Sequence, residues 1–236
     1  MVNLKRYFLV LIFAAFAVCF LTGYSSAEVG NQVTWAYTYG RYLTDIAHSI
    51  QQTSDGGYIV AGQTSNGGND SFWVLKLGSS GNIQWQKTYG GFGADTANSI
   101  QQTSDGGYIV AGLTGHATTS LGGMWVLKLD SSGNIQWQKV YGGSGRGDSA
   151  LSIQQTSDGG YIVAGVKEPA DFWILKLDSD GNVYSCPEVI KESNAVATDT
   201  SAIVTDTTVT AMDTNASPLV TNTIAVDTHV ITRAVC

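Results

Sequence analysis

The sequence has little charge, little proline and few cysteines, and each shortage excludes a class of protein. Only 13% of the 236 residues are charged, and 19 acidic residues against 12 basic ones give a formal net charge of −7. This balance argues against a nucleic-acid-binding surface or a basic membrane patch. With only 3 prolines, the 28 glycines are not those of a collagen or a Pro-rich chain. Because 43% of the residues are hydrophobic, the chain can bury a core and is not wholly disordered.

The chain also lacks a second long apolar run after its first 21 residues. Lys5 and Arg6 precede fifteen uncharged residues, Tyr7–Leu21, and small residues follow at Ser25-Ser26-Ala27. The run is shorter than the about 20 residues of a spanning helix, so we predict a secretory signal peptide over residues 1–27 rather than a membrane anchor. Val18 before Cys19 makes a poor lipidation site. The mature chain is therefore expected to be extracellular or at the cell surface (periplasmic in a Gram-negative cell), with no membrane span.

Removal of this segment leaves two cysteines, Cys186 and Cys236. In an exported protein they are a candidate disulfide, and two unpaired thiols are the alternative. No C-x-x-C sequence occurs, which excludes a zinc knuckle or a thioredoxin motif.

A repeated unit of about 50 residues is the main feature that is present. The sequence SIQQTSDGGYIVAG spans Ser49–Gly62 and returns unchanged at Ser99–Gly112 and Ser152–Gly165. A second block, FWVLKLGSSGNIQWQKTYGG from Phe72 to Gly91, recurs as MWVLKLDSSGNIQWQKVYGG and then decays to FWILKLDSDGNVYSC. Such a period, with turn signals roughly every 8–12 residues, favours a β-propeller or a related β-array over a helical solenoid.

Each unit predicts four strands joined by glycine-containing turns. In the first copy these strands are expected at 49–53, 58–61, 73–77 and 83–89. The second and third are apolar at consecutive positions, as in strands covered on both faces, whereas the fourth alternates and should lie outermost. The repeat residues expected to build the scaffold are Trp73, Trp85, Trp125, Trp137, Trp173, Gly56, Gly57, Gly106, Gly107, Gly159 and Gly160.

The predicted fold class is all-β, with a propeller-like array of three four-stranded antiparallel blades. We expect a repeat domain over 28–186, with a leading outer strand at 33–39 and blades at about 44–91, 94–143 and 147–186. Residues 187–236 form a tail rich in Thr, Val and Asp, without glycine or aromatic residues and with a loose seven-residue echo of Asp-Thr pairs. Such a tail favours short, weakly ordered strands, with a low-complexity extension as the alternative.

The repeat resembles known propeller sequences. SIQQTSDGGYIVAG is similar to the first hairpin of WD40-type blades, although no WD dipeptide occurs. LDSSGNIQW, from Leu129 to Trp137, resembles the motif of quinoprotein-like propellers in which an Asp, a glycine turn and a Trp lock adjacent blades, with one residue fewer between Asp130 and Trp137. The first copy has Gly78 at the Asp position. As a whole the chain resembles secreted bacterial and archaeal tandem-repeat proteins, which implies a β-propeller-like fold and no particular activity.

The sequence does not decide whether the blades close into a ring. Propellers have about 4–8 blades, and this chain supplies three and a leading outer strand. An open arc, two chains that complete one ring, and a truncated copy of a longer ancestor all fit. Because an open arc leaves sheet faces and edges uncovered, we expect self-association.

A single catalytic site needs residues that occur in one copy of the repeat and not in the others. Few polar residues of this chain meet that condition. Acids recur before the first strand and in its hairpin turn, and a lysine recurs in the third strand, where it is expected to snorkel or to cap an edge. No nucleotide-binding, nucleophile-elbow or metal-ligand motif occurs, so we predict no catalytic residue, cofactor or metal. The repeated groups are Asp45, Asp95, Asp148, Asp55, Asp105, Asp158, Lys76, Lys128 and Lys176.

Sequence variation collects between the second and third strands of each unit, at 63–71, 113–123 and 166–171. We therefore expect a secreted, non-enzymatic repeat scaffold that binds a protein or a glycan through these loops. The alternatives are a hydrolase-like enzyme built on loop carboxylates, a quinoprotein-like enzyme, and a vestige of a longer protein. The candidate binding residues are Asn69, Asp70, His116, Glu168 and Asp171.

Overall fold

Strands and turns account for the regular structure of this chain. The computed structural model describes residues 34–40, 43–65, 67–68, 70–90, 93–115, 122–142, 147–169, 171–184, 190–192, 196–199 and 203–206. These residues contain fifteen strands, and those from Trp35 onward belong to one compact unit. In this part of the chain no helix has the length and apolarity to cross a membrane. The predicted signal peptide, Cys186 and Cys236 lie outside the described residues.

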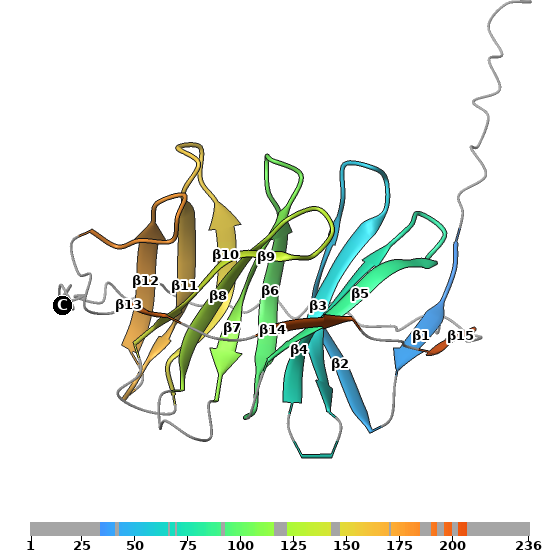
Figure 1. Ribbon diagram of the computed structural model, residues 1–236, viewed down its shortest axis with the longest axis horizontal. Coiled ribbons are helices and arrows are strands. Elements are labelled where there is room, and N and C mark those ends of the chain that lie inside the picture. The colour runs from blue at the N-terminus through green and yellow to red at the C-terminus, as the bar shows by residue number, and fades with distance from the viewer. Residues whose placement is uncertain are drawn as a thin grey trace, which may run out of the picture. The chain divides into compact units, whose positions relative to one another are not determined.

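Each repeat forms an antiparallel sheet whose strands pair in chain order, as Figure 1 shows. Blade 1 consists of β2 (Thr44–Gln52), β3 (Tyr58–Ser65), β4 (Asp70–Leu77) and β5 (Ile83–Gly90). Blade 2 consists of β6 (Thr96–Gln102), β7 (Tyr108–Thr114), β8 (Gly123–Leu129) and β9 (Ile135–Tyr141). Blade 3 consists of β10 (Ser149–Gln155), β11 (Tyr161–Lys167) and β12 (Asp171–Leu177). The predicted all-β, propeller-like array of three blades is thus confirmed.

The first hairpin turn explains why two glycines recur in every copy. Gly56 has a φ of +80°, which strongly favours glycine, and its N–H donates to the carbonyl of Thr53. A Cβ on Gly57 would stand 2.2 Å from the carbonyl oxygen of Leu77, so any side chain there would collide with backbone. Gly106, Gly107, Gly159 and Gly160 repeat both roles in blades 2 and 3.

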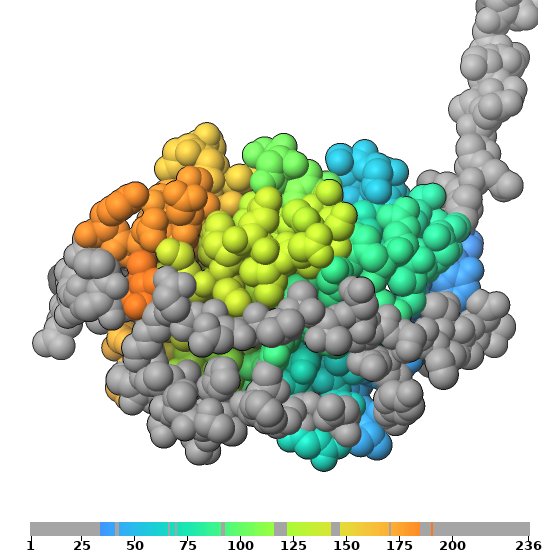
Figure 2. All heavy atoms as spheres, viewed as in Figure 1, coloured from blue at the N-terminus to red at the C-terminus, as the bar shows by residue number. Residues whose placement is uncertain are grey.

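Apolar side chains fill the two interfaces between successive blades. Phe72 of blade 1 packs on Trp125 of blade 2, with ring centroids 4.4 Å apart, and Met124 of blade 2 belongs to the same cluster as Trp173 of blade 3. Every residue of β8 is buried, because blade 2 is covered on both faces. In Figure 2 blade 1 (cyan and teal), blade 2 (green and lime) and blade 3 (yellow and orange) follow one another in this order.

The array differs from three equal four-stranded blades at its two ends. Blade 3 has three strands, because the block that forms β5 and β9 decays there to the letters VYSC and no outer strand follows β12 within the described residues. Conversely, the leading strand β1 (Tyr37–Gly40) is an outer strand, and within the described residues no equivalent of β2–β4 precedes it.

Three short strands of the tail lie along the outer strands of the array. β13 (Ile190–Glu192) pairs with β9, β14 (Val196–Asp199) with β5, and β15 (Ile203–Asp206) with β1. Ile190, Ala197 and Val204 stand opposite the equivalent residues Tyr141, Tyr89 and Tyr39. A shift of seven residues along the tail therefore leads from one outer strand of the array to the next. We call β13, β14 and β15 the strap.

Candidate functional site

A lysine and an aspartate lock the first hairpin of every blade. The ammonium group of Lys128 lies 2.8 Å from a carboxylate oxygen of Asp105, which also accepts from the hydroxyl of Thr103 and the N–H of Gly107. Burial favours the neutral acid, but these hydrogen bonds outweigh it and hold the pKa of Asp105 at about 2. Lys76–Asp55 and Lys176–Asp158 repeat the pair. The predicted snorkelling lysine is thus an ion-pair partner, and these groups are structural.

A second acid is buried where one blade passes to the next. Asp95 is 3% exposed and accepts from the hydroxyl of Thr114 at 2.7 Å. Asp148 is 1% exposed and accepts from the backbone N–H of Glu168 at 3.0 Å. A Cβ on Gly90 or Gly142 would approach these carboxylates to 2.6 Å and 2.1 Å, so the glycine at the end of each outer strand leaves room for the next acid. Both acids hold the chain at the blade junction.

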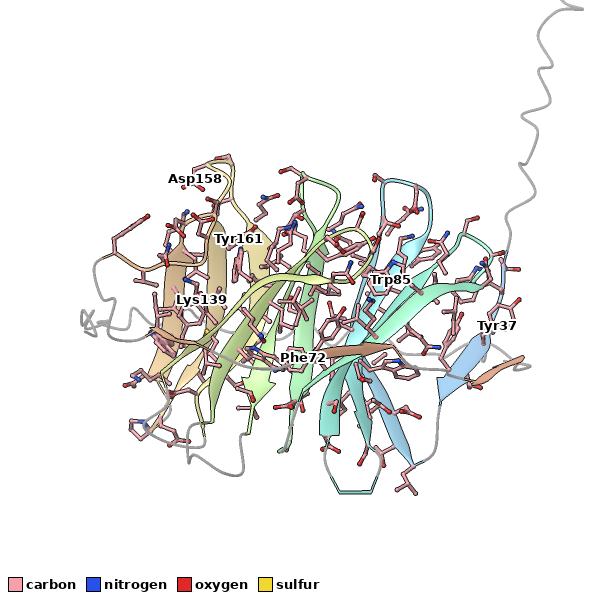
Figure 3. All side chains as sticks on the ribbon, in the orientation of Figure 1. Tyr37, Phe72, Trp85, Lys139, Asp158 and Tyr161 are labelled. Carbon is pink, nitrogen blue, oxygen red and sulfur yellow. The ribbon has the colours of Figure 1, made fainter. Side chains whose placement is uncertain are left out.

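Two aromatic side chains of each outer strand dock onto the following blade. The indole N–H of Trp85 donates to the carbonyl of Ser131, and the hydroxyl of Tyr89 to that of Gly133, both in the β8–β9 turn. Trp85 also meets Tyr108 edge to face, at 5.8 Å. Trp137 and Tyr141 dock in the same way on Ser179 and Gly181 of blade 3. Figure 3 places Trp85 at this junction, near the edge that carries the hairpin turns.

The leading strand makes the same contacts on blade 1. Trp35 donates to the carbonyl of Ser79, Tyr39 donates to that of Gly81, and Trp35 meets Tyr58 edge to face at 5.9 Å. β1 therefore occupies the position of the outer strand of a blade that would precede blade 1.

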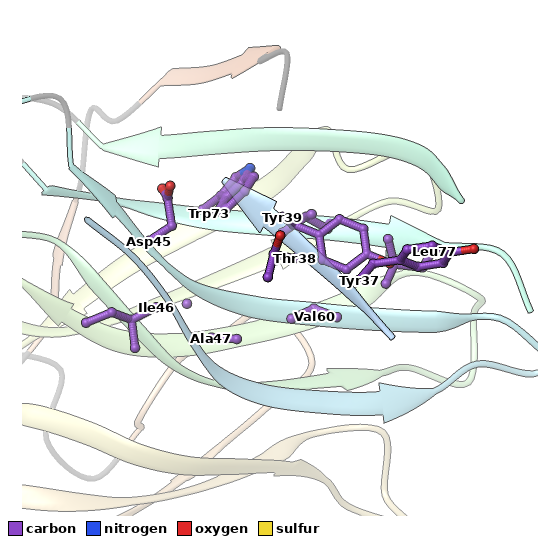
Figure 4. A pocket seen from close by; sticks show the side chains of 11 residues that line it. Tyr37, Thr38, Tyr39, Asp45, Ile46, Ala47, Val60, Trp73 and Leu77 are labelled. Carbon is purple, nitrogen blue, oxygen red and sulfur yellow. The ribbon is translucent and has the colours of Figure 1, made fainter. Parts of the chain in front are cut away.

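A pocket of about 250 Å³ lies between β1 and the end face of blade 1 (Figure 4). Its lining includes Tyr37 and Tyr39 from β1, Ile46 from β2, and Trp73 and Leu77 from β4. At the two internal junctions the equivalent space is filled by apolar side chains of the preceding blade, such as Phe72 in front of Trp125. The pocket is therefore the apolar space that a preceding blade would occupy.

The face of blade 3 that points away from blade 2 is exposed at the other end of the array. Phe172 is 97% exposed, although Phe72 and Met124 at the same repeat position are fully buried. On the other side of the array, Ile50 is 61% exposed, whereas Ile100 and Ile153 are 5% and 2% exposed. The array thus ends in two faces on which residues that are buried in the internal copies are exposed, Phe172 on blade 3 and Ile50 on blade 1, whereas Trp73 and Leu77 of blade 1 are buried.

The variable connections all lie on one rim. Because neighbouring strands are antiparallel, the strand ends that border the β3–β4, β7–β8 and β11–β12 connections lie at the edge opposite the hairpin turns, the lower edge in Figure 1. Of the candidate binding residues, Asp70 begins β4, Asp171 begins β12, and Glu168 directly follows β11. Blade 2 lies between Asp70 and the other two acids, so the three are not brought into one cluster. Asn69 and His116 lie outside the described residues.

Within the described ranges no group of three or more His, Cys, Asp or Glu side chains could hold a metal ion. No protein-family model matches the chain, and no curated protein matches its sequence. The features that set parts of this array apart from its repeated scaffold are the variable rim and the two end faces.

Sequence reasoning missed two parts of this arrangement. The signal for the Lys–Asp pairs is that an aspartate and a lysine recur together, 18 to 23 residues apart, in all three copies. The seven-residue echo of the tail indicates the strap strands, but the sequence does not indicate which outer strands they pair with.

Proposed function

We propose that this chain is an exported, non-enzymatic repeat scaffold that binds a protein or a glycan at the rim formed by the β3–β4, β7–β8 and β11–β12 connections. The supporting observation is the contrast between the two rims. The hairpin-turn rim is copied from blade to blade, and its polar side chains hold turns and junctions. The opposite rim carries the connections that differ in length and sequence, as expected of a binding surface on a constant scaffold.

The chemistry of this rim suits a polar ligand. The side chains of Glu168 and Asp171 are exposed, and that of Asp70 is partly exposed. Ionised carboxylates accept hydrogen bonds from sugar hydroxyls and pair with basic side chains of a protein. A hydrolase-like enzyme, the alternative function, would need two of these carboxyl groups about 5–9.5 Å apart across one bond.

Export follows from the amino-terminal sequence pattern rather than from the fold. The test is the amino-terminal sequence of the protein recovered from cells that express the full chain. A mature product that begins at Glu28 supports export through a cleaved signal peptide, and an intact amino terminus contradicts it.

Binding is tested by probing a glycan and protein array with the exported full chain. We expect Asp70→Asn, Glu168→Gln and Asp171→Asn together to weaken binding by about tenfold or more, because charged hydrogen bonds are lost. A matched control changes the other rim through Ser80→Ala, Ser132→Ala and Asp180→Asn, and should bind like the unchanged chain. Silence of the unchanged chain on the array, or an equal loss in the control, overturns the proposal.

A further inference from the structure

We propose that copies of this chain associate head to tail, with blade 3 of one copy seated on blade 1 of the next. In this contact β1 of the second copy becomes the outer strand of blade 3 of the first. The inference concerns the ends of the array and does not depend on what the variable rim binds.

The two ends are incomplete in matching ways. Blade 3 has strands β10–β12 and, among the described residues, no strand on the outer edge of β12. β1 is an outer strand that already carries its strap strand, β15, in the register that β14 keeps with β5. Addition of β1 to β12 would give a five-stranded sheet in the order β15-β1-β12-β11-β10, matching the β14-β5-β4-β3-β2 sheet of blade 1.

The internal interfaces supply the register of this contact. In blade 1, Phe72 stands opposite Tyr89, Trp73 opposite Thr88 and Val74 opposite Lys87, and blade 2 repeats this pairing. The equivalent pairs between copies are Phe172 with Tyr39, Trp173 with Thr38, and Ile174 with Tyr37. Phe172 and Ile174 are exposed in the single chain, so neither side chain is already covered by another part of it.

The uncovered faces also match as surfaces. The blade 1–blade 2 interface buries Phe72 and Val74 on one side and Ile100 and Trp125 on the other. The free ends present Phe172 and Ile174 on blade 3, and Ile50 with the pocket in front of Trp73 on blade 1. Because the chain contains this interface twice, a second copy is the partner whose surface is already known to fit.

Polar groups at the two ends match in the same way. Inside the chain, the side-chain oxygen of Gln51 accepts from the N–H of Gln102, and that of Gln101 accepts from the N–H of Gln155, each at 2.6 Å. At the ends, Gln154 on blade 3 and the N–H of Gln52 on blade 1 are the corresponding acceptor and donor. A sheet edge that lacks a partner in the single chain is a template for such pairing.

A contact between different surfaces of identical chains is heterologous and makes either a closed ring or a longer assembly. Two copies would supply six blades, which is within the about 4–8 of closed propellers. In a closed ring and in a longer assembly alike, the mass of the species is a multiple of the mass of one chain.

Sedimentation of the exported full chain tests the association. We expect a concentration-dependent mass of two or more copies, reduced to that of one copy by Phe172→Asp and, separately, by Ile50→Asp. Both side chains are exposed in the single chain, so circular dichroism should show an unchanged fold. Gln84→Asp, on the exposed side of β5, is the control and should leave the assembly intact.

Mixing the two variants tests the head-to-tail geometry. The Phe172→Asp chain keeps an intact blade 1 end and the Ile50→Asp chain an intact blade 3 end, so the mixture should recover a species of two chains. A chain that stays monomeric at every concentration, or a mixture that does not recover association, overturns the proposal.

A cysteine pair tests the register. Opposite residues of an antiparallel pair have Cα atoms about 4.5–5.5 Å apart, within the range of a disulfide. In a background with Cys186→Ser and Cys236→Ser, a Tyr37→Cys chain mixed with an Ile174→Cys chain should give a mixed disulfide dimer on oxidation. Neither variant alone should cross-link, and equal cross-linking of the single variants contradicts the head-to-tail contact.

Discussion

Blade 2 and blade 3 share most of the letters of strands two and three, yet their burial differs. β8 is buried at every position, whereas β12 is buried only at Trp173, Leu175 and Leu177, on the face toward blade 2. The difference lies in the neighbours, because blade 2 has one on each face and blade 3 has one. In a repeat array the burial of a residue is therefore set by the unit beside it as well as by its own unit.

The same comparison applies to the charged groups that hold the turns. The side chain of Lys128 is 5% exposed, and that of Lys176, in the same position on the end blade, is 48% exposed. The ion pair is kept in both places, so it serves the hairpin, while its burial depends on the next blade.

The largest effect is expected from the aromatic residue that faces the next blade. Phe72→Ala should lower the free energy of unfolding by about 3–5 kcal/mol, because a fully buried ring is replaced by a cavity beside Trp125. Phe172→Ala should change it by less than about 0.5 kcal/mol in dilute solution. Urea unfolding measured below the concentration of association checks both. Equal losses would mean that Phe172 is covered in the single chain.

The buried lysine should give the next largest contrast. Lys128→Met should lower the free energy of unfolding by about 1–3 kcal/mol, because Asp105 and the carbonyl of Leu129 lose a donor. Lys176→Met should cost much less, because water replaces the lost donor at an exposed site. Thermal unfolding of the two variants side by side is the measurement. A larger loss for Lys176→Met would show that the end blade depends on its ion pair more than the internal blade does.

The strap offers a contrast in register rather than in burial. Insertion of one residue after Asn194 should prevent β13 and β14 from both keeping their partners, because the step from Ile190 to Ala197 matches one outer strand. We expect a loss of about 1 kcal/mol, as for a few cross-strand pairs.

The control for the strap is an insertion of seven residues. Duplication of residues 196–202 keeps the seven-residue step, so its stability should stay close to that of the unchanged chain. Guanidinium unfolding of the three proteins compares them, and equal stabilities for the one-residue and seven-residue insertions would contradict a register set by the step.

The parts of the fold that the sequence predicts are those in which local pattern and repetition agree. The glycine pairs predict the turns at Gly56 and Gly57. Continuous apolar runs predict strands two and three, and a period of two predicts the outer strand that carries Trp85. The sequence predicted four strands for blade 3 as well, but among the described residues its sheet has three, and the decay of WQKTYGG to VYSC is the signal that could have indicated this.

What could not be predicted is the pairing between segments that are far apart in the chain. The β-branched residues of the tail indicate short strands and its Asp-Thr pairs predict turns between them, but neither indicates which edge those strands join. The same limit applies to the candidate rim acids. Loop variability identifies Asp70, Glu168 and Asp171 as candidates, but only the order of the blades in space shows that Asp70 lies apart from the other two.

The smallest effect concerns one carboxylate and its proton. The pKa of Asp105 is held at about 2 in the folded chain by Lys128, Thr103 and Gly107, against about 4 for an unfolded Asp. As the pH falls, the unfolded chain binds this proton first, so the stabilisation is complete above about pH 4 and is lost between about pH 4 and pH 2. The free energy of unfolding should therefore fall less steeply over this range in Asp105→Asn than in the unchanged chain, and Ser80→Ala should keep the original slope. Identical slopes for Asp105→Asn and the unchanged chain would show that the charge of Asp105 contributes nothing to the internal hairpin.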